Sequence, residues 1–133
     1  MTHPTTWLLD LDGVVWLGER TIPGSPEAIA RLRDAGRRVG FCTNNSYEAV
    51  GDYVDRLGAH GIDAAPDDVV SSAVAVVSLL AEGQRVLVSG GPGVVEAVRS
   101  AGAVPIGPTE DPDGPIDAVV MGFNPAFDYA LMK

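Results

Sequence analysis

The chain has 133 residues, of which 46% are hydrophobic and 20% charged, a composition that excludes a disordered protein and leaves room for a modest core. Eighteen acidic against nine basic residues give a net charge of −9, so a phosphate-rich polymer would be repelled and nucleic acid is not an expected partner. Without an apolar run of membrane-spanning length or the pattern of a signal peptide, we expect a cytoplasmic protein with no membrane partner.

The first predicted element is a short buried strand at residues 7–9, which leads into Asp10, Leu11, Asp12 and Gly13. Residues i and i+2 of an extended chain face the same side, so Asp10 and Asp12 are expected to share one site. Neighbouring carboxylates repel each other, and a hard cation such as Mg²⁺ offsets that repulsion. Asp10 is then a candidate nucleophile and Asp12 a candidate proton shuttle. An alternative interpretation remains open: the segment can be a strand-ending turn with no chemical role, because Asp and Gly are both common in turns.

A turn-rich segment at residues 14–22 precedes the first predicted helix. Ser25 is a suitable N-cap for a helix that starts at Pro26 and ends before Gly36. The next apolar run, residues 38–43, predicts a second strand. Together these elements predict a right-handed βαβ unit with parallel strands.

Thr43 ends this second strand and is followed by Asn44, Asn45 and Ser46. The βαβ connection predicts that Thr43 lies beside Asp10 at the carboxyl edge of the sheet, where ligands bind in open parallel sheets. Either Asn45 or Ser46 can cap a following helix, whose N-terminus would favour an anion. We therefore expect Thr43 and Asn44 to hold a substrate phosphate, although Asn44 can also be read as a turn residue.

The rest of the chain continues to alternate between strands and helices, which predicts an α/β fold with a mostly parallel sheet. The predicted strands are residues 69–72, 85–89, 103–106 and 117–123, and the predicted helices are residues 73–81 and 94–100, with a further helix around 127–131.

A glycine-rich turn at residues 89–93 follows one of these strands and precedes a helix, as a dinucleotide-binding loop does. The spacing is a weak match, because Glu96 stands where that pattern has a third small residue. We interpret the turn as a structural connection between strand and helix.

Two segments, residues 7–16 and 38–46, together resemble the first two motifs of the haloacid dehalogenase (HAD) superfamily of phosphotransferases. The sequences of these two motifs are similar to those of the branch that contains NagD-like, 4-nitrophenylphosphatase and glycerol-phosphate phosphatase enzymes. The resemblance implies an HAD-like Rossmannoid core with an inserted cap. We accordingly expect residues 1–82 to be the N-terminal part of the core and residues 83–133 part of an α/β cap.

The resemblance also implies a mechanism. Asp10 would attack phosphorus to form an aspartyl-phosphate, and Asp12 would protonate the leaving group and later activate water. Gly13 would let the backbone pass close to the phosphate, and Thr43 would bind a phosphoryl oxygen. Mg²⁺ would be held by the Asp10 carboxylate, the Asp12 main-chain carbonyl and a further acidic residue. The implied substrate is a small phosphomonoester such as glycerol phosphate, phosphoglycolate or a nucleotide.

The family's lysine and its later acidic motif have no counterpart in this sequence, whose single lysine is Lys133 in the expected cap. We therefore interpret the chain as the N-terminal half of an Mg²⁺-dependent phosphatase that is inactive or very weak by itself. The alternative is a non-catalytic protein that binds a phosphate ligand or a partner. The oligomeric state stays open, and a homo-oligomer is compatible with the sequence.

Overall fold

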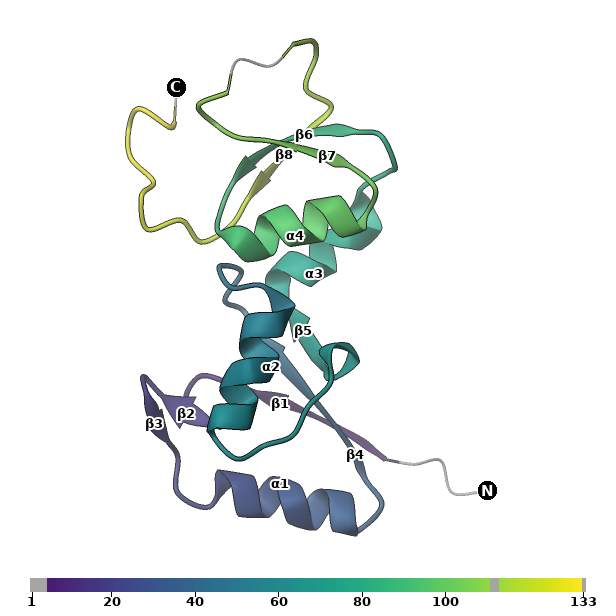
Figure 1. The fold of residues 1–133 in the computed structure, drawn as a ribbon, viewed down its shortest axis with the longest axis vertical. Helices are drawn as coiled ribbons and strands as arrows, with labels where there is room; N and C mark the ends of the chain where they lie inside the picture. The colour runs from purple at the N-terminus through teal and green to yellow at the C-terminus, as the bar shows by residue number, and fades with distance from the viewer. Residues whose placement is uncertain (1–4, 111–112, 133) are drawn as a thin grey trace. The chain divides into compact units, whose positions relative to one another are not determined.

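The computed structural model describes residues 5–110 and 113–132, so that His3 and Lys133 lie outside the described part of the chain. It divides into two compact units (Figure 1). The first comprises Met1–Thr43 and Val50–Val70, and the second comprises Asn44–Ala49 and Ser71–Lys133. The expected division into a core at residues 1–82 and a cap at residues 83–133 stays a prediction.

The first unit is built on a three-stranded sheet of β1 (Thr6–Asp10), β4 (Arg38–Thr43) and β5 (Val69–Ser71), in the order β1-β4-β5. β1 and β4 are parallel, and helix α1 (Ser25–Asp34) connects them. The predicted α/β architecture and the predicted βαβ unit are confirmed.

A hairpin, a second helix and a short 3₁₀ turn complete this unit. A hairpin of β2 (Trp16–Leu17) and β3 (Arg20–Thr21) lies within the turn-rich segment after β1. Helix α2 (Val50–Ala59) leads to the short 3₁₀ turn η1 (Pro66–Asp68) before β5.

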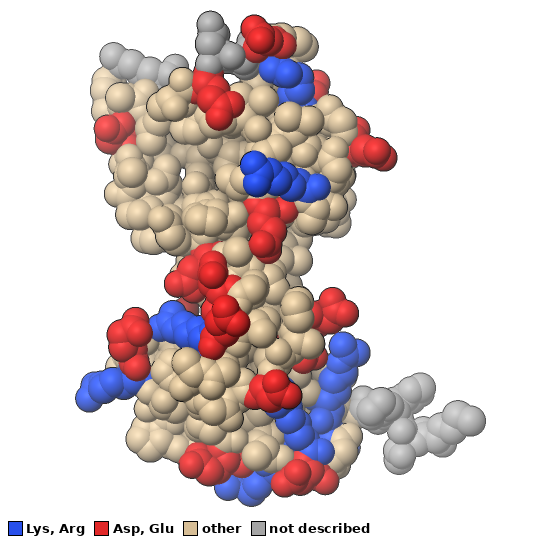
Figure 2. Space-filling view, in the orientation of Figure 1, with Lys and Arg blue, Asp and Glu red and all other residues tan. Residues whose placement is uncertain are grey.

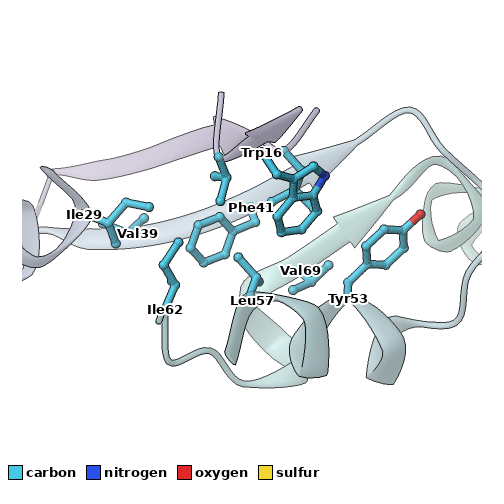
Figure 3. Packing of buried hydrophobic residues seen from close by; sticks show 10 residues of the cluster. Trp16, Ile29, Val39, Phe41, Tyr53, Leu57, Ile62 and Val69 are labelled. Carbon is cyan, nitrogen blue, oxygen red and sulfur yellow. The ribbon is translucent and has the colours of Figure 1, made fainter. Parts of the chain in front are cut away.

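The core of the first unit forms where α1, α2 and the turn after β1 meet the sheet (Figure 3). Trp16, Phe41 and Leu57 are fully buried there, and Tyr53 is nearly so. Because Trp16 comes from the β2–β3 hairpin and Leu57 from α2, burial of their apolar surface ties both elements to the sheet.

The prediction that residues 7–9 form a buried strand is wrong as regards burial. β1 is a strand, but Trp7 is 47% and Leu8 62% exposed, and only Leu9 is half-buried. β1 is an edge strand among the described residues and pairs only with β4. An apolar run identifies a strand, whereas burial also depends on which elements cover it.

The predicted cap of α1 is also wrong. The N-cap is Gly24, which adopts a φ of 87° and makes no side-chain cap bond, while Ser25 is the first helical residue. The Ser25 hydroxyl donates instead to the main-chain oxygen of Val14, at 2.6 Å. The end of α1 is as predicted, because Gly36 has a φ of 70° after the C-cap Ala35.

The helix after Thr43 begins later than predicted, at Val50 rather than next to Asn45 or Ser46. The Asn45 side chain accepts a hydrogen bond from the main-chain N–H of Tyr47, at 2.9 Å, and so closes a local turn. Such side-chain turns compete with helix formation. The Asn-Asn-Ser segment is therefore a loop, and the argument that a helix N-terminus holds the phosphate does not apply to it.

The second unit contains a parallel sheet with strand order β7-β6-β8. Its strands are β6 (Arg85–Ser89), β7 (Val104–Ile106) and β8 (Ala118–Met121). Helix α4 (Pro92–Ser100) packs on this sheet together with α3 (Ser72–Val76), and their buried side chains form a second core. The predicted helix at residues 73–81 is shorter than expected, since α3 passes into the 3₁₀ turn η2 (Val77–Leu79).

The helix expected around residues 127–131 is absent from the described residues, which form turns there. Asn124 accepts from the N–H of Ala126 and closes a turn before Phe127. Asp128 then accepts from the N–H groups of Ala130 and Leu131, which fixes one further turn. Two isolated turns do not overcome the cost of helix nucleation. No helix in the described chain has the length and hydrophobicity needed to span a membrane.

Candidate active site

Asp10 and Thr43 lie at the carboxyl ends of neighbouring parallel strands, as their sequence positions predict. In the β1–β4 ladder, Asp10 is paired with Cys42, and Thr43 is the next residue of β4. Asp10 is exposed, whereas Thr43 is only 5% exposed. The main-chain N–H of Leu11 donates to Oδ1 of Asp10 at 2.9 Å, which orients that carboxylate.

Asp12 follows the end of β1, in a tight turn. Asp10 and Asp12 are exposed while Leu11 between them is fully buried, so the alternation expected of extended chain continues through this segment. The Leu11 carbonyl accepts from the N–H groups of the residues three, four and five positions later, which bends the chain back. Gly13 adopts a φ of 83° in this turn, a conformation that favours glycine.

The turn also gives Asp12 a partner that the sequence analysis missed. The indole N–H of Trp16 donates to Oδ1 of Asp12 at 2.9 Å. An aromatic residue four positions after an aspartate is the only sequence signal for this contact. It is a weak one, because it takes the turn at Leu11 to bring the two side chains together.

The side chains present fit part of a magnesium site. Asp10 and Asp12 supply oxygen donors of the kind that Mg²⁺ prefers, and one oxygen of Asp10 is already held by a main-chain N–H. Within residues 5–110 and 113–132, no group of three or more His, Cys, Asp or Glu side chains lies together as a metal cluster. The described residues would supply part of such a site and do not by themselves complete it.

Asn44, the fifth predicted site residue, is grouped with the second unit, and its position relative to Asp10 stays a prediction. Its main-chain carbonyl accepts from the Ser72 hydroxyl at 2.8 Å. Together with Asn45 and Phe123, Asn44 lines a shallow pocket of about 290 Å³. Asn44 is therefore fixed by second-unit elements and exposed to solvent.

The glycine-rich turn at residues 89–93 supports the loop that contains Asn44. The N–H of Gly93 donates to the Tyr47 carbonyl at 2.8 Å. A Cβ atom on Gly93 would lie 2.1 Å from the Glu48 carbonyl oxygen, and one on Gly91 would lie 2.3 Å from the Tyr47 ring. The Gly93 N–H is already bonded to protein and is not available to a phosphate, which favours the structural interpretation of the turn.

A separate pocket of about 440 Å³ in the first unit is lined by residues at the start of β4, including Arg38. It therefore lies at the opposite end of that strand from Thr43. Its charged lining is mixed, with Arg33 and Arg37 beside Asp63 and Asp68. The visible face of this unit likewise carries acidic and basic side chains interspersed (Figure 2).

Asp10 and Thr43 thus lie at the carboxyl edge of a parallel sheet in an α/β protein, the edge where ligands bind in open sheets of this kind. Comparison with known proteins identifies the family. Residues 7–104 match the family described as "Haloacid dehalogenase-like hydrolase". The chain belongs to the haloacid dehalogenase-like hydrolases.

Its relatives are named phosphatases. Human glycerol-3-phosphate phosphatase is 34% identical over 149 aligned positions, which cover 93% of this chain and 46% of that protein. Phosphoglycolate phosphatase 2 of Arabidopsis thaliana is 31% identical, with 96% and 49% covered. The structure of a glycerol phosphate phosphatase from Mycobacterium tuberculosis in complex with magnesium is 29% identical with a TM-score of 0.82, covering 96% of this chain and 38% of that one. The chain thus spans about half the length of the curated relatives it matches.

Proposed function

We propose that this chain forms the N-terminal part of a Mg²⁺-dependent phosphomonoester hydrolase that acts on a small phosphorylated metabolite in the cytoplasm. The observation that carries the proposal is the register of β1 and β4, which sets Asp10 beside Cys42 and Thr43 in a chain of the haloacid dehalogenase-like family. The names of the relatives favour glycerol phosphate or phosphoglycolate as the substrate class, with a nucleotide as a further candidate.

In this proposal Asp10 is the nucleophile. A carboxylate oxygen of Asp10 bonds to phosphorus while the bond between phosphorus and the leaving oxygen breaks. Asp12 gives its proton to that leaving oxygen and afterwards takes a proton from the water that cleaves the aspartyl-phosphate. Thr43 and Asn44 would hold phosphoryl oxygens, and Gly13 would leave room for the phosphate to approach the backbone.

Bound Mg²⁺ would neutralise charge on the phosphoryl group, and the Asp10 carboxylate and the Asp12 main-chain carbonyl are the groups of this chain proposed to hold it. The proposed domains are residues 1–82 as the first part of the catalytic core and residues 83–133 as part of the cap. A cap of this kind would cover the leaving group and set specificity.

The test is the release of inorganic phosphate by the polypeptide as its native cell makes it, supplied with glycerol phosphate, phosphoglycolate and a nucleoside monophosphate. We expect turnover of at least one ester, loss of turnover when EDTA removes divalent metal, and recovery when Mg²⁺ is restored. Tight binding of phosphate without turnover of any ester would instead support the non-catalytic alternative.

A further inference from the structure

The Asp12 carboxylate has a hydrogen-bond partner in the first unit that has no role in the mechanism proposed above. The Trp16 indole donates its N–H to Oδ1 of Asp12 at 2.9 Å. Trp16 is fully buried, whereas Asp12 is exposed. A buried indole N–H needs an acceptor, so this hydrogen bond restrains a side chain that would otherwise rotate in solvent.

The indole is itself held by α2 and the residue that follows it. The Arg56 guanidinium carbon lies 4.3 Å from the centroid of the Trp16 ring, and the His60 ring stacks on it at 5.1 Å with an angle of 28° between the planes. Arg56 and His60 are four residues apart and therefore share one face of the helical segment. Figure 3 shows the Trp16 ring next to Phe41, with its nitrogen at the margin of the core.

The side chains of Arg56 and His60 are in turn held by the β2–β3 hairpin. Arg56 donates to the main-chain oxygen of Gly18 at 2.7 Å, and His60 Nδ1 is 2.7 Å from the Thr21 hydroxyl oxygen. The ring of Trp16 is therefore packed against two side chains that are themselves hydrogen-bonded to the hairpin. Its N–H position is set by that packing and not by contact with solvent.

We propose that Trp16 is a positioning residue that holds Asp12 in the orientation needed to protonate the leaving group. This inference rests on the proposed phosphatase function. Because Trp16 bonds to Oδ1, the remaining oxygen, Oδ2, carries the proton that passes to the leaving oxygen as its bond to phosphorus breaks. The same oxygen then receives the proton of the attacking water.

The test compares kcat/KM for an alkyl phosphomonoester and for 4-nitrophenyl phosphate, measured on the polypeptide as its native cell makes it. Trp16→Phe removes the N–H donor and keeps an aromatic ring. The 4-nitrophenolate ion leaves without help from a proton, whereas an alkoxide needs one. We expect Trp16→Phe to lower kcat/KM for the alkyl ester about tenfold more than for the nitrophenyl ester, a fraction of what general acid catalysis supplies. Trp7→Phe, at an exposed tryptophan of β1, is the matched control and should change neither value.

A merely structural role for Trp16 would lower both values by the same factor, and that result would overturn the inference. In an Asp12→Asn background, Trp16→Phe should cause no further selective loss, because the two residues act as one unit. If Trp16→Phe does not fold, Arg56→Leu serves as the test instead. This substitution removes a partly exposed side chain that packs on the indole, and so it loosens the indole. We expect the same selective loss by a smaller factor, and its absence in a folded variant contradicts the role.

The failure of this inference is distinguishable from failure of the proposed function. A wild-type protein that hydrolyses neither ester, or one whose turnover survives Asp10→Asn, overturns the phosphatase proposal, and the positioning role falls with it. Hydrolysis that depends on Asp10 but shows no selective effect of Trp16→Phe overturns only the positioning role.

Discussion

The two units use the same strand-turn-helix architecture for different purposes. In the first unit, β1 ends in Asp10 and a turn that exposes a second carboxylate. In the second unit, β6 ends in Ser89 and a turn of glycines that lets the loop at residues 44–49 approach closely. In the proposed enzyme, the chemistry therefore depends on the residues at the strand ends and not on the parallel sheet that both units share.

The largest expected effect comes from removing the acidic group at the end of β1. Asp10→Asn should lower phosphomonoester turnover by on the order of 10³-fold or more, because an amide is a poor nucleophile. Asp117→Asn is the matched control in the second unit, where Oδ2 of Asp117 accepts from the Arg85 N–H. Steady-state phosphate release should be unchanged in that control. Equal losses of phosphate release in both variants would contradict the proposed difference in function between the two units.

A smaller effect is expected at the glycine turn of the second unit. Gly93→Ala should destabilise this unit by about 2–3 kcal/mol, because the added Cβ meets a main-chain carbonyl that can move only with its loop. Hydrogen-deuterium exchange should rise at residues 44–49 and remain unchanged in β1 and β4. Protection of the loop equal to that of the wild type would show that the turn does not hold it.

The smallest effect concerns a glycine that has no such constraint. Apart from its chain neighbours and the nearby backbone of its own helix, no described atom lies within 4 Å of a Cβ built on Gly58 in α2. Gly58→Ala should raise the free energy of unfolding by about 0.5–1 kcal/mol, since alanine loses less conformational freedom in a helix. Denaturant titration measures this change. A loss of stability would mean that α2 depends on a contact of Gly58 itself.

The local sequence pattern predicted which segments form strands and helices better than it predicted which elements pack against them. The strand at residues 85–89 was predicted with its correct bounds, because its β-branched residues lie between turn residues. The proximity of Asp10 and Thr43 followed from the parallel pairing of neighbouring strands that a βαβ unit predicts. The exposure of Trp7 could not be predicted in this way, since it depends on which elements cover β1.

Contacts between residues distant in sequence account for most of the remaining differences. The late start of α2 reflects a loop held by the Gly93 N–H and by the Phe123 N–H, which donates to the Ser46 hydroxyl at 2.7 Å. The contact between Trp16 and Asp12 required the bend at Leu11. Neither feature has a periodicity or a cap signal that sequence reasoning could use.

In the proposed mechanism, Asp10 becomes phosphorylated during turnover. The most direct measurement is to quench the native polypeptide during hydrolysis of a small phosphomonoester, reduce it with borohydride and locate the modified residue by peptide mass spectrometry. An aspartyl-phosphate is reduced to homoserine, so we expect this conversion at Asp10 alone and its absence from Asp10→Asn. Continued turnover with conversion at another residue, or with none, would contradict the claim.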